Sequence, residues 1–201
     1  TDFIGGACIL AGALMILILG ANPIEAFAAL LEGAFGSPNA LADTVVKATP
    51  LLLVGLGICI SFRGNVINIG GEGQMIIGAL IATAIGLALP EAPALVVVPL
   101  ALLGGFLGGG LWGGIPGALK AYFNVNEILS TIMMNAIAVQ LMNFLLSGPM
   151  IDPIQASKDS QIPQTARLAS EFDLPRLIPT RLHLGALIAV VLAVVVYILL
   201  W

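Results

Sequence analysis

The chain has 201 residues, of which 59% are hydrophobic and 9% are charged, and its mean hydropathy is +1.10. An ordinary soluble domain carries about 25% charged residues, so this composition excludes a water-soluble globular protein. It predicts an all-α protein that crosses a lipid bilayer several times. The net charge is -4 and no basic cluster is present, which excludes nucleic acid as a partner.

The sequence predicts about six membrane spans, each charge-poor and close to 20 residues long. In chain order they are Phe3 to Gly20, Leu41 to Phe62, Gln74 to Leu89, Ala92 to Ala121, Ile128 to Leu146 and Leu184 to Trp201. Together they predict a single transmembrane domain over residues 1–201. Between the first two spans, the stretch from Asn22 to Glu32 has a helix-start signal and is predicted to lie along the membrane interface.

Both ends of the chain have the appearance of cut ends, so we expect a fragment truncated at the C-terminus. The chain begins without methionine, and the first span lacks the positive flank of a signal peptide. At the other end, an apolar run stops at Trp201. Because the first apolar stretch lacks the positively charged start of a signal peptide, we interpret it as a membrane helix.

One long polar connection, residues 147–183, contains five prolines, four acidic and four basic residues. Its prolines argue against a long helix, and a loop of this length is typical of a functional segment, here one that receives a soluble partner. A disordered surface loop is the alternative. Arg63 and Lys120 are two spans apart, so they lie on the same side of the membrane. The positive-inside rule makes that side cytoplasmic, although the position of Lys47 opposes this assignment. The connection is then extracytoplasmic.

The segment from Arg63 to Gln74 is polar and rich in glycine, and it lies between two apolar spans. Its glycines predict a broken or re-entrant segment that exposes backbone groups, as in many transporters. Asn65, Asn68 and Gln74 can each donate and accept hydrogen bonds, which suits the hydroxyls of a sugar or the edge of a base. Glu72 could accept from hydroxyls or balance Arg63. The alternative is an ordinary cytoplasmic turn.

A stripe of polar side chains follows one side of the fifth span. It comprises Thr131, Asn135, Gln140 and Asn143. Such groups face a bundle interior or a water-filled path, although interhelical hydrogen bonding without a solute explains them equally well. Just before this span, Asn124 is the predicted N-cap, with Glu127 three residues on, and a part in an inner gate is a secondary possibility.

The fourth span is predicted to pack tightly, because small residues recur along it at spacing four. They are Gly105, Gly109, Gly113 and Gly117, and again Gly110 and Gly114, with a kink expected at Pro116. Cys8 and Cys59 have no metal-ligand spacing and are interpreted as packing thiols. With His183 the only histidine and no catalytic motif, the sequence predicts no metal site, no cofactor and no enzyme.

Two stretches resemble permease subunits of bacterial nucleoside and simple-sugar ABC importers, within the branched-chain amino acid and ribose-type superfamily. The first resemblance runs through Thr49–Gly57, Ser61–Gly64 and Asn68–Gln74, and the second through Asn124–Asn135. They occur in the expected order, and the resemblance extends over nearly the whole chain, although complete members are considerably longer.

The resemblance implies a multi-pass subunit in the cytoplasmic membrane of a bacterium. It implies three protein partners: a second permease subunit, a cytoplasmic ATPase and an extracytoplasmic solute-binding protein. The segment that contacts the ATPase is expected just after Trp201. The residues expected near the solute path are Asn65, Asn68, Glu72 and Gln74, with Asn135 from the facing helix. An ion-coupled secondary transporter of a small polar solute is the alternative, and a membrane scaffold without a solute is a third.

Overall fold

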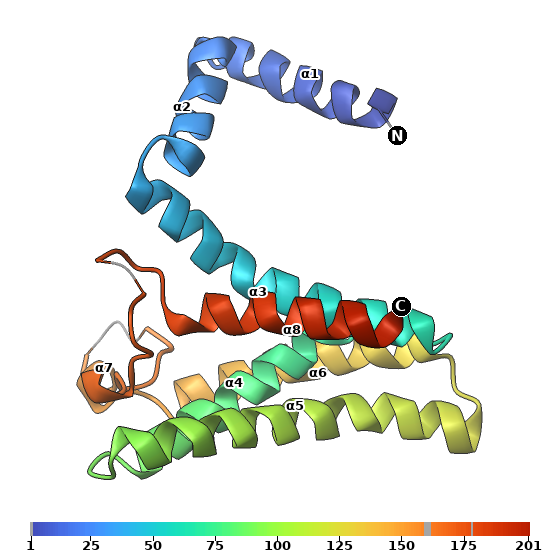
Figure 1. The fold of residues 1–201 in the computed structure, drawn as a ribbon, viewed down its shortest axis with the longest axis vertical. Coiled ribbons are helices and arrows are strands. Elements are labelled where there is room, and N and C mark those ends of the chain that lie inside the picture. Colours follow the sequence, from blue (N-terminus) through green and yellow to red (C-terminus); the bar gives the residue numbers. More distant parts are fainter. Residues whose placement is uncertain (1, 159–161, 178) are drawn as a thin grey trace. The chain divides into compact units, whose positions relative to one another are not determined.

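A computed structural model describes residues 2–158, 162–177 and 179–201, with side chains from residue 5 onward. Its elements, in chain order, are α1 (Asp2–Ile18), α2 (Pro23–Phe35), α3 (Pro38–Arg63), α4 (Gly71–Ala88), α5 (Ala94–Phe123), α6 (Glu127–Ser147), α7 (Pro153–Ala156), the 3₁₀ turn η1 (Ser170–Phe172) and α8 (Leu184–Leu200) (Figure 1). In the described residues the one extended pairing is an isolated bridge between Arg176 and His183. The predicted all-α, polytopic fold is confirmed.

Four helices, α3 to α6, are long and apolar enough to cross a membrane. They correspond to the second to fifth predicted spans. The first and last predicted spans form α1 and α8, which have 17 residues each. At 1.5 Å per residue such a helix is about 26 Å long, slightly short of a bilayer core of about 30 Å.

The stretch after α1 is helical as predicted and forms α2, which is bent by 116° from α1. Asn22 begins it: its Oδ1 accepts from the N–H of Ile24 at 3.0 Å, its Nδ2 donates to Glu25 at 3.0 Å, and Pro23 occupies the first turn. The pair α1 and α2 can count as one broken span, which raises the number of candidate spans to five. A position of α2 along the membrane interface stays a prediction.

The chain packs as two compact units. The first consists of Thr1–Pro50 and Pro175–Ala189, and the second of Leu51–Leu174 and Val190–Trp201. In the first, the Thr44 hydroxyl donates to the carbonyl of Ala34 at 2.9 Å. The second contains the packed helices α4, α5 and α6 and the buried cluster of Ile77, Leu80 and Ala138. The candidate site lies in this second unit.

Glycines bring the backbones of α4 and α5 into direct contact. A Cβ built on Gly78 would lie 2.8 Å from the carbonyl oxygen of Gly105, and one on Gly109 would lie 2.9 Å from that of Gln74. The predicted tight packing of the glycine stripe is therefore confirmed at Gly105, Gly109 and Gly113. At the other three stripe positions, Gly110, Gly114 and Gly117, no atom of the described part of the chain lies within 4 Å of such a Cβ.

The prediction that Asn124 is the N-cap of α6 is wrong. Asn124 is the C-cap of α5 in the left-handed region (φ 52°), and its N–H donates to the carbonyls of Leu119 and Lys120. Asn126 is the N-cap of α6, where its Oδ1 accepts from the N–H groups of Ile128 at 2.9 Å and Leu129 at 3.4 Å. Asparagine suits both kinds of cap, so the Asn-Val-Asn sequence alone does not assign the roles.

Replacing Asn126 with alanine is expected to lower the free energy of unfolding by about 1 kcal/mol, because α6 loses its side-chain cap. Asn126→Asp should retain most of the stability, since a carboxylate accepts the same bonds at the positive end of the helix. Thermal unfolding in detergent would measure both, and equal midpoints for the two variants would contradict the assignment of Asn126 as the cap.

The proline-rich connection contains, in its described part, the four residues of α7 and the turn η1 as its helical segments. The absence of a long helix there confirms the prediction made from its prolines. Its middle part returns to the helices, where a Cβ on Gly86 of α4 would lie 2.6 Å from the side chain of Leu168. That the connection receives a soluble partner stays a prediction.

Candidate functional site

The predicted break between the second and third spans is present as residues 64–70, between the end of α3 and the start of α4. Asn65 adopts the left-handed region with φ 54° and reverses the chain after α3. The N–H of Asn65 donates to the carbonyl of Phe62 and that of Val66 to Ser61, at 3.1 and 3.0 Å. The following α4 begins at Gly71 without a side-chain cap from its own N-cap residue, Gly70.

The side chain of Asn135, on the facing helix α6, forms two hydrogen bonds to the backbone at this break. Its Oδ1 accepts from the N–H of Gly73 at 2.9 Å, and its Nδ2 donates to the carbonyl of Ile69 at 3.0 Å. The N–H of Gly73 lies in the first turn of α4, where backbone donors have no partner within the helix. Asn135 therefore caps α4 in the way a local N-cap would, and it ties the break to α6.

Asn68 and Gln74 complete the same hydrogen-bonded network. The Oδ1 of Asn68 accepts from the N–H of Gly70 at 2.8 Å and from the Nε2 of Gln74 at 3.4 Å. The Gln74 side chain fits against Gly113 of α5, where a Cβ would lie 2.7 Å from its Nε2. The structure therefore brings together three of the five predicted site residues: Asn68, Gln74 and Asn135.

A cavity of about 430 Å³ opens beside the break, between the ends of α3 and α5 and the start of α6. Small-molecule sites commonly have volumes of about 300 to 1,000 Å³. Its polar lining residues are Ser61, Asn68, Lys120, Glu127 and Thr131. The cavity is thus large enough for a small polar solute and has hydrogen-bonding groups on three helices and the break.

Three of these groups have hydrogen-bonding capacity left over. Because the Oδ1 of Asn68 is fixed as an acceptor, its Nδ2 is a donor, and it has no partner in the described part of the chain. The hydroxyls of Ser61 and Thr131 donate to the carbonyls of Gly57 at 3.0 Å and Glu127 at 2.7 Å, so their oxygens can still accept. This combination suits a hydroxyl group, which both donates and accepts.

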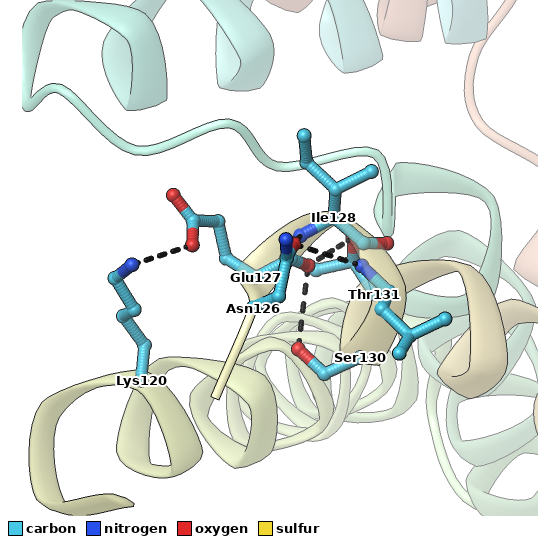
Figure 2. A network of polar contacts seen from close by, with 7 residues as sticks. Lys120, Asn126, Glu127, Ile128, Ser130 and Thr131 are labelled. Carbon is cyan, nitrogen blue, oxygen red and sulfur yellow. Dashed lines mark hydrogen bonds and ion pairs between the residues drawn. The ribbon is translucent and has the colours of Figure 1, made fainter. Parts of the chain in front are cut away.

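The charged groups of the cavity are paired with each other. The Nζ of Lys120, in the last turn of α5, lies 2.7 Å from a carboxylate oxygen of Glu127 at the start of α6. Figure 2 shows this ion pair across the short turn, with Asn126 and Ser130 bonded to the backbone beside it. The Glu127 side chain is 17% exposed and that of Lys120 is 46% exposed.

Trp112 of α5 lies on the other side of the network. A Cβ on Gly73 would lie 2.9 Å from the Oδ1 of Asn135 and 3.1 Å from the Nε1 of Trp112, so only glycine fits there without displacement. The indole Nε1 is buried and has no acceptor among the described residues. Neither the position of Trp112 beside Gly73 nor that of Ser61 in the cavity wall was predicted, because no local sequence pattern indicates either contact.

The remaining predicted polar residues differ in whether they face the cavity. Asn65 and Glu72 are exposed and do not line the cavity, so their contact with a solute stays a prediction. Of the polar stripe on α6, Thr131 is buried and Asn135 is half-buried, whereas Gln140 and Asn143 are exposed in this chain. The inward part of the stripe is therefore its N-terminal half.

Several curated proteins are similar to this chain. A guanosine ABC transporter permease protein, NupP of Bacillus subtilis, is 38% identical over 93% of this chain and 53% of its own length. A glucose ABC transporter permease protein, TsgB13 of Haloferax volcanii, is 31% identical over 96% of this chain and 52% of its own length. A nucleoside ABC transporter permease protein, NupB of Lactococcus lactis, is 31% identical over 68% of this chain and 38% of its own length.

The chain thus spans about half the length, or less, of the curated relatives that it matches. No solved structure matches it significantly. The family model described as branched-chain amino acid transport system / permease component matches residues 40–201, which include the break, the cavity and four helices long enough to span a membrane. The chain is therefore a multi-pass membrane protein that belongs to this family of transport permease components.

Proposed function

We propose that this chain is part of the transmembrane subunit of an ATP-driven importer, and that the cavity beside the break lies on the path of a nucleoside or a related simple sugar. The relatives named for guanosine, nucleosides and glucose support this class of solute. Family membership favours an ATP-driven importer over the ion-coupled carrier. The cytoplasmic membrane of a bacterium is the proposed location.

The observation that carries the proposal is the juxtaposition of a broken helix with a cavity of about 430 Å³. The cavity offers two hydroxyl acceptors and the amide donor of Asn68, which has no partner among the described residues. Broken helices with uncommitted polar groups are how many transporters bind a polar solute inside a membrane. Asn68 is the proposed solute contact. Gln74 and Asn135 are proposed to position the wall, and Asn65 and Glu72 remain candidates farther along the path.

Three protein partners belong to the proposal. Hydrolysis of ATP is assigned to a separate cytoplasmic subunit, a second permease subunit completes the path, and an extracytoplasmic binding protein delivers the solute. The proline-rich connection is the proposed contact for that binding protein. Support for all three comes from the relatives' description as ABC transporter permeases.

Replacing Asn68 with aspartate tests the proposed solute contact. The carboxylate can still accept from the N–H of Gly70 and from Gln74, but the free Nδ2 donor is lost. Uptake of labelled nucleosides by the full-length transporter should fall about tenfold, which corresponds to one hydrogen bond of about 1.4 kcal/mol, with little change in the unfolding midpoint. Asn39→Asp adds the same charge at an exposed position at the start of α3, outside the break and the cavity lining, and should leave uptake near wild type.

The energy source is tested on the same transporter. We expect uptake to stop when the ATPase subunit is inactivated and to continue when the ion gradient is collapsed. Uptake that survives without the ATPase but stops without the gradient would overturn the importer proposal in favour of an ion-coupled carrier. Equal uptake by Asn68→Asp and wild type would remove Asn68 from the solute site, but it would not affect the conclusion on the energy source.

A further inference from the structure

Among the described residues that line the cavity, Lys120 and Glu127 are the only charged ones. The rest of the lining is apolar, glycine or uncharged polar. The nearby Arg63 does not line the cavity, and its guanidinium donates to the carbonyl of Leu200 at the end of α8. Glu72 is exposed and lies outside the lining. The net charge of the cavity therefore depends on one ion pair.

The two members of the pair come from adjoining helix ends and meet across a capped turn. Asn124 ends α5 and Asn126 begins α6, and both caps fix the backbone on either side of Val125. The Nζ to carboxylate distance of 2.7 Å places the two charges in direct contact. In surroundings of reduced dielectric constant, a charge without its partner acts on a solute several ångströms away far more strongly than it does in water.

We infer that the Lys120–Glu127 ion pair determines the charge selectivity of this cavity: it keeps the cavity neutral and thereby admits neutral solutes while disfavouring anions and cations. The inference rests on the proposed function only in placing the cavity on a solute path. Neither residue needs to contact the solute, because each acts by cancelling the field of the other. A pair that only stabilises the turn would leave selectivity unchanged when either charge is removed alone.

The electrostatic part is tested without any transport measurement. The starting protein is the full-length transporter with all its native cysteines replaced, Cys8→Ala and Cys59→Ala included. Val66→Cys then places a thiol in the cavity lining, and Ile67→Cys places one beside it outside the lining. The measured quantity is the ratio of reaction rates with an anionic sulfonatoethyl and a cationic trimethylammonium-ethyl methanethiosulfonate, in detergent so that both sides are accessible.

Glu127→Gln should shift this ratio about tenfold toward the anionic reagent at Val66→Cys, because Lys120 is left unpaired, and Lys120→Met should shift it by a similar factor toward the cationic reagent. The double variant should react like wild type. The thiol at Ile67→Cys, outside the lining, should show a much smaller shift of this ratio in the same single variants. Single variants with unchanged ratios at Val66→Cys would overturn the inference.

The transport part uses competition between solutes. In wild type, a nucleoside monophosphate should compete with nucleoside uptake only weakly, and in Glu127→Gln its half-inhibitory concentration should fall about tenfold relative to that of the neutral nucleoside. Wild type that takes up no nucleoside or sugar would refute the proposed function alone, since the thiol ratios still report the field in the cavity. Uptake with unchanged competition in both single variants would refute the selectivity role alone.

Discussion

Asn135→Leu is expected to lower the free energy of unfolding by about 1 to 3 kcal/mol and to abolish most of the uptake of the full-length transporter. Leucine has a similar size but cannot accept from the buried N–H of Gly73 or donate to the carbonyl of Ile69. A buried backbone donor left without a partner carries its full desolvation cost. The N-cap residue of α4, Gly70, has no side chain that could replace this cap.

Asn143→Leu is the matched control for this prediction. It lies on the same helix, makes the same chemical change and is exposed in this chain. Thermal unfolding in detergent and solute uptake should separate the two variants, with Asn143→Leu close to wild type in stability. If both variants unfold at the same temperature, Asn135 does not hold the break, and the cavity wall depends on other contacts.

The break itself could be predicted from the sequence, whereas the way it is held could not. Glycines at 64, 70, 71 and 73 predict that a helix ends there, because they permit backbone angles closed to other residues. Asn135 was predicted to face this segment through its family resemblance, but its two bonds to the backbone depend on the packing of α4 against α6. Such contacts between residues more than 60 positions apart have no local sequence signal.

The charged residues of the cavity show a second limit. Lys120 was interpreted as a marker of the cytoplasmic side and Glu127 as part of a helix start, and each interpretation uses only local sequence. Their ion pair depends on the left-handed conformation of Asn124, which turns the chain so that the two helix ends meet. The sequence could not distinguish this cap from the N-cap two residues later.

Tight packing was predicted for the whole glycine stripe of α5, but only Gly105, Gly109 and Gly113 contact α4. Gly78→Ala and Gly109→Ala each place a methyl group less than 3.0 Å from a backbone oxygen of the opposite helix. A backbone atom cannot move aside as a flexible side chain can, so α4 and α5 must separate. Overpacking of this kind costs about 1 to 3 kcal/mol.

Gly110→Ala and Gly114→Ala are the matched controls, because they make the same change on the same helix where nothing lies within 4 Å. There the methyl group meets no atom of the described residues, and alanine favours a helix over glycine by about 1 kcal/mol, so their unfolding midpoints should be equal to or above wild type. Opposite shifts for Gly109→Ala and Gly110→Ala would confirm the contact. The Gln74 side chain of α4 packs against Gly113 of α5, so separation of the two helices should also open the cavity wall. Gly109→Ala should therefore reduce uptake, whereas an uptake loss in Gly110→Ala without a stability loss would reveal a partner surface on the other side of α5.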